Sequence, residues 1–169
     1  MRKSIKILML ALAAMLIAGG ASSVNAKDKK GLKYNSNTEY NAEALGRNTE
    51  DIKVVRLEGK GETEEAATED AMMKAVACAL FCGFPSAGDG VTQPTPAIIS
   101  DANAEVTYKQ FLTEFFKPGG DYKKYVAVST IVPTKASSKV SKNLYRVRIG
   151  MDVSYNALKE EMKKNGVVK

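Results

Sequence analysis

Residues 144–155 contain the clearest periodic pattern in this chain. Apolar side chains occupy every second position, and an arginine, glycine, aspartate or serine occupies each position between them. Side chains of a β-strand point alternately to the two faces of its sheet, so one face of this strand is covered and the other meets water. Such a chain must build a sheet and must supply an apolar layer that covers one of its faces.

A helix over residues 63–81 is predicted to provide that layer. Thr63 is a candidate N-cap, because two glutamates follow it and negative charge suits the first turn of a helix. The alanine-rich stretch that follows has high helix propensity and ends before Gly83. Residues 75–84 carry no polar side chain except thiols, so the second half of this helix is expected to be buried nearly all round.

The remaining elements follow from the same periodicity and from glycine and proline positions. They are a strand at 52–58 that ends at the glycines of 59–61, a helix at 104–116, a strand at 125–132, a polar hairpin connector at 134–143 and a short helix at 156–164. This order predicts an α+β domain over residues 52–169, with helices on one face of a mainly antiparallel sheet of about three strands in a two-layer arrangement. We expect the two glycines to let the chain turn tightly and pack closely under the first helix.

Residues 1–26 have the pattern of a secretory signal peptide. Basic residues precede an uninterrupted apolar run at 7–18, and the tripeptide Val-Asn-Ala at 24–26 matches a signal-peptidase site. The apolar run is too short to span a bilayer as a stable helix. The sequence therefore predicts cleavage after Ala26 and a periplasmic or secreted protein with no transmembrane segment after cleavage.

The signal segment also bears on lipid attachment. Residues 16–19 read Leu-Ile-Ala-Gly, like the start of a bacterial lipoprotein box, but Gly20 stands where the lipid-bearing cysteine would be. We expect a protein that is not lipid-anchored. Residues 27–51 are polar and aperiodic and are predicted to be a flexible leader, the alternative being a segment that docks through its tyrosines.

Charge and composition exclude several functions. The sequence has 25 Lys and Arg, 19 Asp and Glu, and no His. Removing the three basic residues of the signal segment leaves 22 against 19, a net charge of +3 with scattered lysines, which disfavours nucleic-acid binding. Without His there is no imidazole base and no Ser-His or Cys-His pair. We expect a non-enzymatic protein without cofactor or metal, the alternative being an exported hydrolase-type enzyme that uses Asp and Glu.

A family resemblance rests on residues 54–79. They combine a strand, the motif Gly59-x-Gly61-x-Thr63 and alanines at 67, 71, 75 and 79. This pattern, together with the later Tyr-Arg-Val at 145–147, resembles the LPP twenty-kilodalton lipoprotein family and the N-terminal domain of the flagellar assembly protein FlgT. The resemblance spans residues 52–164. It implies a non-catalytic cell-envelope domain that contacts an envelope protein or an anionic surface component, and it transfers no catalytic residue.

One candidate binding surface lies on the water-facing side of the predicted sheet. Arg56, Arg146 and Arg148 are predicted to share this face with Tyr125. Guanidinium groups form bidentate contacts, so the cluster could hold a carboxylate, a phosphate or an anionic glycan. The alternative is a solvated face on which these arginines pair with Glu or Asp.

Two further features carry less chemistry. Cys78 and Cys82 are four residues apart in the predicted helix, where Cβ atoms stand about 5 to 6 Å apart, against roughly 3.8 Å in a disulfide. We expect buried unpaired thiols, the alternative being a disulfide with the last turn unwound.

Residues 85–103 form a long irregular loop whose Asp89 and Asp101 define no acid/base pair. This loop is predicted to be a surface loop that ranks ahead of the helices as an interaction surface.

Overall fold

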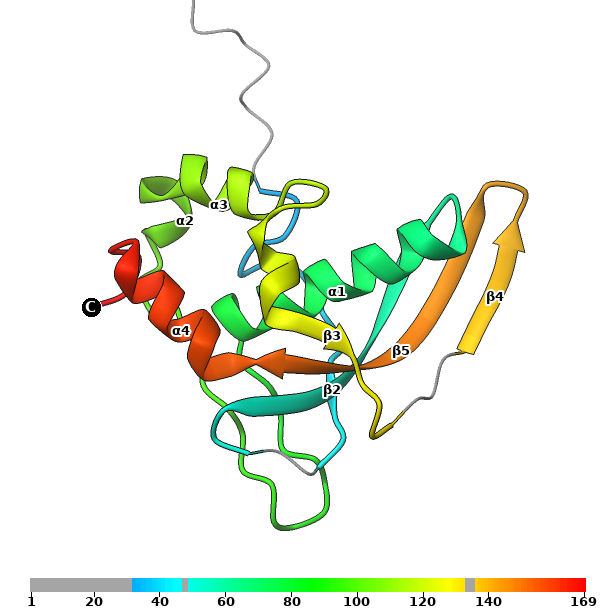
Figure 1. The fold of residues 1–169 in the computed structure, drawn as a ribbon, viewed down its shortest axis with the longest axis horizontal. Coiled ribbons are helices and arrows are strands. Elements are labelled where there is room, and N and C mark those ends of the chain that lie inside the picture. The colour runs from blue at the N-terminus through cyan, green and yellow to red at the C-terminus, as the bar shows by residue number, and fades with distance from the viewer. Residues whose placement is uncertain (1–31, 47–48, 133–135) are drawn as a thin grey trace, which may run out of the picture. The chain divides into compact units, whose positions relative to one another are not determined.

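The structure, a computed structural model, describes residues 32–46, 49–132 and 136–169, so the predicted signal peptide lies outside the described residues. The central element of this part of the chain is an antiparallel sheet (Figure 1). Its strands are β1 (Glu43–Ala44), β2 (Ile52–Gly61), β3 (Val126–Val128), β4 (Ala136–Ser141) and β5 (Leu144–Ser154). The spatial order is β1-β2-β5-β3, with β4 also paired to β5. The predicted α+β class with an antiparallel sheet is confirmed.

The predicted number of about three strands is wrong, because the described residues form five. The two additional strands lie where the sequence has no apolar alternation. β1 has two residues and pairs with β2, Glu43 standing opposite Arg56. β4 occupies the predicted polar connector, and all six of its residues are exposed. Strands β1 and β4 exist because their backbones pair with β2 and β5. Backbone pairing of this kind produces no pattern of side chains in the sequence.

Strand β5 has the two-sided character expected from its alternation. Val147, Ile149, Met151 and Val153 are all at most 2% exposed. β5 pairs along its length with β2, so that Leu57 stands opposite Ile149. Because β3 and β4 pair with its other edge, β5 is the central strand of the sheet.

Helix α1 (Glu64–Phe81) covers the apolar face of β2 and β5 (Figure 1). The hydroxyl oxygen of Thr63 accepts a hydrogen bond of 3.1 Å from the backbone N–H of Ala66, which confirms the predicted N-cap. Residues 75–81 are all buried, as their composition predicts. The helix is therefore the apolar layer that β5 requires.

The two glycines before α1 have a different role from the turn predicted for them. β2 does not end at Glu58 but continues through Gly61. A Cβ on Gly59 would lie 1.9 Å from the carbonyl oxygen of Ala67, and one on Gly61 would lie 2.5 Å from the amide nitrogen of the same residue. The predicted close approach of helix and strand is thus present, and it occurs within the strand.

Of the other two predicted helices, one is broken and one agrees with its predicted bounds to within one residue. The expected helix at 104–116 is divided into α2 (Ala104–Thr107) and α3 (Lys109–Phe115) at Tyr108, whose hydroxyl donates to the carbonyl oxygen of Gly166 at 2.6 Å. A 3-10 helix, η2 (Asp121–Tyr125), takes the start of the strand predicted at 125–132. Helix α4 (Tyr155–Lys164) buries Leu158 and Met162, as predicted.

The leader predicted for residues 27–51 is not a free tail from residue 32 onward. Tyr34 is 3% exposed and Tyr40 is 6% exposed, and both belong to the same hydrophobic core as α1. The hydroxyl of Tyr40 donates to the carbonyl oxygen of Asn35 at 2.8 Å, which folds this segment onto itself. The alternative reading of a segment that docks through its tyrosines describes residues 32–46.

Candidate functional site

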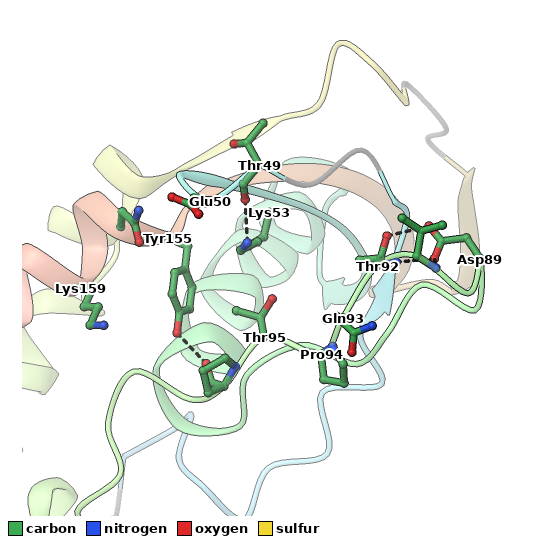
Figure 2. A pocket seen from close by; sticks show the side chains of 13 residues that line it. Thr49, Glu50, Lys53, Asp89, Thr92, Gln93, Pro94, Thr95, Tyr155 and Lys159 are labelled. Carbon is green, nitrogen blue, oxygen red and sulfur yellow. Dashed lines mark hydrogen bonds between the residues drawn. The ribbon is translucent and has the colours of Figure 1, made fainter.

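A groove lies between three segments that are far apart in sequence. It has a volume of about 850 Å³ and lies between the start of β2, the loop that follows α1, and the start of α4 (Figure 2). The lining residues are Thr49, Glu50, Lys53, Asp89, Val91, Thr92, Gln93, Pro94, Thr95, Pro96, Tyr155, Asn156 and Lys159. Much of the 85–103 loop lines this groove. The sequence analysis predicts that this loop is a better candidate interaction surface than the helices.

The base of this loop is held firmly against α1. Phe84 and Thr95 exchange two backbone hydrogen bonds of 2.8 Å, and the amides of Ile98 and Ile99 donate to carbonyls in the last turn of α1 at 3.0 and 2.8 Å. Gly83 has a φ of +74°, and a Cβ there would meet the carbonyl oxygen of Thr95 at 2.1 Å. The wall of the groove is therefore a fixed part of the fold.

The tip of the loop is shaped by a local side-chain cap. The carboxylate of Asp89 accepts hydrogen bonds from the backbone amides of Val91 and Thr92 at 2.9 and 2.7 Å and from the Thr92 hydroxyl at 2.6 Å (Figure 2). These bonds, those from Thr92 first, lower the pKa of Asp89 to about 2. Asp89 thus serves to order the loop, and its carboxylate oxygens are already engaged.

The floor of the groove is set by Tyr155. Its hydroxyl donates to the carbonyl oxygen of Pro96 at 2.7 Å, joining the start of α4 to the loop (Figure 2). Lys53 donates to the carbonyl oxygen of Thr49 at 2.6 Å, and its Nζ lies 5.9 Å from the centre of the Tyr155 ring. Burial raises the pKa of Tyr155, so its hydroxyl remains a neutral donor.

Three charged or amide side chains of the groove are left for a ligand. Glu50, Gln93 and Lys159 make no hydrogen bond or ion pair with any residue in the described ranges. They supply one carboxylate, one amide and one ammonium beside the exposed surfaces of Pro94 and Pro96. Apolar surface with a few separated polar groups is typical of binding sites.

The sheet face predicted to bind an anion is an ion-pair network. Arg56 and Arg148 both contact Glu43, at 3.1 and 2.7 Å, and Arg146 contacts Glu58 at 3.2 Å. The structure therefore brings the three predicted arginines to one face. Because each is already paired with a carboxylate across strands, the alternative of a solvated, cross-paired face describes the geometry.

Tyr125 does not belong to this face, which corrects its predicted position. Its ring stacks on Phe115 of α3, with centroids 6.0 Å apart, and packs against the hydrophobic core. Burial, together with the Glu161 carboxylate, raises the pKa of Tyr125 to about 12. The strand predicted to present Tyr125 begins only at Val126, so the alternation that would have placed this residue does not apply.

Helix α1 carries a buried carboxylate, Asp70, that was not predicted from the sequence. Asp70, 6% exposed, accepts hydrogen bonds from Lys33 Nζ at 3.0 Å, from the backbone N–H of Lys60 at 3.0 Å and from the Tyr34 hydroxyl. Lys74, one turn further along α1, lies 2.9 Å from its second oxygen. An aspartate flanked by buried alanines at helical spacing is the signal that could have revealed it.

The electrostatics of this cluster follow from its donors. Burial alone would raise the pKa of Asp70, but the bonds from Tyr34, Lys74, the Lys60 amide and Lys33 lower it to about 2. Burial and the same carboxylate raise the pKa of the Tyr34 hydroxyl. Asp70 is a fully engaged anion that joins residues 33–34 to α1 and β2.

The two cysteines are free thiols in different surroundings. Cys78 is buried and donates to the carbonyl oxygen of Gly83 at 3.1 Å, and burial raises its pKa to about 12. Cys82 is exposed at the C-cap of α1, so the prediction of two buried thiols is wrong for this residue. No group of three or more metal-ligating residues occurs within residues 32–46, 49–132 and 136–169.

Comparisons with known proteins give no further guide. No protein-family model, no curated protein and no solved structure matches this chain. In the described part of the chain, no helix has the length and apolar character needed to cross a membrane.

Proposed function

We propose that this chain is an exported, non-catalytic binding or assembly module of the bacterial cell envelope. It holds a segment of a partner protein in the groove between β2, the 85–97 loop and α4. The observation that carries the proposal is a groove with fixed walls whose Glu50, Gln93 and Lys159 have no partner among the described residues. The signal-peptide pattern and the resemblance to exported envelope domains support the location.

The composition of the groove favours a peptide over a phosphate or a sulfated ligand. Its unpaired groups comprise one ammonium, one carboxylate and one amide, so its free charge is balanced. Pro94 and Pro96, both exposed, add flat apolar surface, which accepts the side chains of an extended chain. A peptide segment supplies both charge signs and backbone hydrogen-bonding groups.

The alternative function, a hydrolase that uses Asp and Glu, needs a free carboxylate in a protected site. The oxygens of Asp70 and Asp89 are occupied by the donors described above. Asp152 is different, because its Oδ1 is buried without a hydrogen-bond partner among the described residues. Glu50 in the groove and Asp152 are therefore the carboxylates on which such a hydrolase would depend, so loss of an activity in Glu50→Gln or Asp152→Asn would support the alternative.

A site-specific crosslinking experiment in intact cells tests the binding function. A photoreactive residue at Gln93, in the groove, is expected to give one reproducible adduct with an envelope protein. The same residue at Val106, 79% exposed on α2 and not part of the groove, is the position control. Lys159→Glu should abolish the adduct, whereas Lys163→Glu on the same helix should not. Equal adducts from positions 93 and 106 would contradict the proposal.

A further inference from the structure

The hairpin formed by β4 and the first half of β5 carries charge of one sign. Residues 136–148 contain Lys139, Lys142, Arg146 and Arg148 and no acidic residue. In Figure 1 this hairpin extends beyond the start of α1, away from α2, α3 and α4. Since every residue of β4 is exposed, these charges stand in solvent on a projecting arm.

Only the base of the arm is neutralised. Arg148 is paired with Glu43 at 2.7 Å and Arg146 with Glu58 at 3.2 Å, both carboxylates coming from neighbouring strands. At the tip, neither Lys139 nor Lys142 has a carboxylate within 4.0 Å among the described residues. The Nζ atom of Lys139 lies 5.5 Å from the centre of the Tyr145 ring. Two ammonium groups without counter-charge therefore mark the end of the hairpin.

Apolar side chains stand among these lysines. Val140 is 50% exposed, and Leu144 and Tyr145 are only partly buried. Basic residues interleaved with exposed apolar ones are typical of segments that lie at a membrane surface, where ammonium groups reach lipid phosphates and apolar groups enter the headgroup region. A nucleic acid would be expected to use stacking on an aromatic face, and the face of Tyr145 is covered by Lys139.

We propose that the tip of the β4–β5 hairpin contacts an anionic phospholipid bilayer. Lys139 and Lys142 bind the headgroup phosphates, and Val140 enters the interfacial layer beside them. Two lysines and one aliphatic side chain give weak, reversible binding. A contact of this affinity raises the concentration of the protein at the membrane surface but does not anchor it there. This contact uses a different surface from the groove and does not depend on what the groove binds.

Vesicle sedimentation with the chain from Lys27 to Lys169 tests this contact. We expect binding to vesicles that contain phosphatidylglycerol and none to vesicles of phosphatidylcholine alone, with weaker binding at higher salt. The double variant Lys139→Gln/Lys142→Gln should lose about fivefold in partitioning for each lysine. The control Lys163→Gln/Lys164→Gln on α4 makes the same change in net charge and should lose much less.

Two further measurements distinguish a bilayer from any other polyanion. Val140→Ser leaves the charge unchanged and should still weaken vesicle binding. A double-stranded oligonucleotide, titrated under the same conditions, should bind far more weakly than the anionic vesicles. Equal losses in the hairpin and α4 variants, no effect of Val140→Ser, or oligonucleotide binding as strong as vesicle binding would each overturn the proposal. Crosslinking from Gln93 is read separately, so failure here leaves the groove function intact.

Discussion

At the scale of single residues, Asp70 is a charged side chain that the fold buries. A carboxylate at 6% exposure is costly unless donors replace the water that it has lost. Lys33, Tyr34, Lys74 and the Lys60 amide do so, from three separate segments. These hydrogen bonds compensate the burial of the Asp70 carboxylate, and those from Lys33 and Tyr34 also hold the 32–46 segment against α1.

Replacing this carboxylate tests the role directly. Asp70→Asn leaves the half-buried amine of Lys74 without its counter-charge and weakens the bond to Tyr34, so we expect the free energy of unfolding to fall by about 3 kcal/mol. Urea denaturation followed by circular dichroism measures the change. Asp121→Asn, which breaks an exposed ion pair with Lys124, is the matched control and should change the free energy of unfolding by well under 1 kcal/mol. Similar losses in both variants would contradict this account.

The same group makes stability depend on pH in the acid range. Its pKa is about 2 in the folded chain and about 3.9 when unfolded, so the folded state binds the proton more weakly. The contribution, about 2 to 3 kcal/mol, is fully present above the unfolded pKa and is lost as pH falls from there through the folded pKa of about 2. The difference in unfolding free energy between the wild type and Asp70→Asn should shrink over this range. A difference that stays constant between about pH 6 and pH 2 would exclude the linkage.

Thiol reactivity distinguishes the two cysteines. Alkylation of the native chain at mildly alkaline pH should modify Cys82, which is exposed, and leave Cys78, which is buried and has a pKa near 12. In denaturant both should react, giving two modified thiols per chain by mass spectrometry. Finding none after unfolding without reductant would establish the alternative disulfide.

At the scale of elements, the contact between β2 and α1 depends on the absence of side chains. Glycine at 59 lets the backbone of the strand meet that of the helix at Ala67 and Ala71. The alanines at helical spacing on α1 were visible in the sequence, and so was the glycine motif. What could not be read from them is that the glycines stay inside the strand, because a glycine pair before a helix is equally typical of a turn.

Adding one methyl group at this contact is expected to be severe. Gly59→Ala places Cβ 1.9 Å from the Ala67 carbonyl oxygen, so α1 must move away from β2, at a cost of about 3 kcal/mol or more. Lys60→Ala, at the next position and exposed, is the control and should leave the unfolding midpoint nearly unchanged. If Gly59→Ala unfolds at the same urea concentration as Lys60→Ala, the close contact is not present in solution.

At the scale of the whole molecule, the folded unit begins at Leu32 and not at the first predicted strand. The segment before Ile52 adds a strand to the sheet, buries Tyr34 and Tyr40 and supplies two donors to Asp70. It also adds Glu43, which pairs with Arg56 and Arg148 on the exposed face of the sheet. The segment is thus part of the fold, and it contributes both to the groove, through Thr49 and Glu50, and to the arginine face of the sheet, through Glu43.

Truncation measures this contribution. A chain that begins at Ile52 loses the burial of two tyrosines, worth about 2 kcal/mol each, and leaves Asp70 with fewer donors, so its free energy of unfolding should fall by more than about 4 kcal/mol. A chain that begins at Leu32 is the control and should match one that begins at Lys27. Equal urea midpoints for chains beginning at Leu32 and at Ile52 would show that the segment does not stabilise the fold.

Local and periodic features of the sequence determined β5, the bounds and cap of α1, and the inward face of α4, since each depends on residues within a few positions of one another. They also led to the three arginines on one face and to the loop that lines the groove. The groove itself, the partners of Asp70 and the pairing of the arginines were decided only by tertiary structure. Asp70 lies 37 residues from Lys33, and Arg148 lies 105 residues from Glu43. Contacts across such separations depend on which segments the fold brings together, and no local pattern records them.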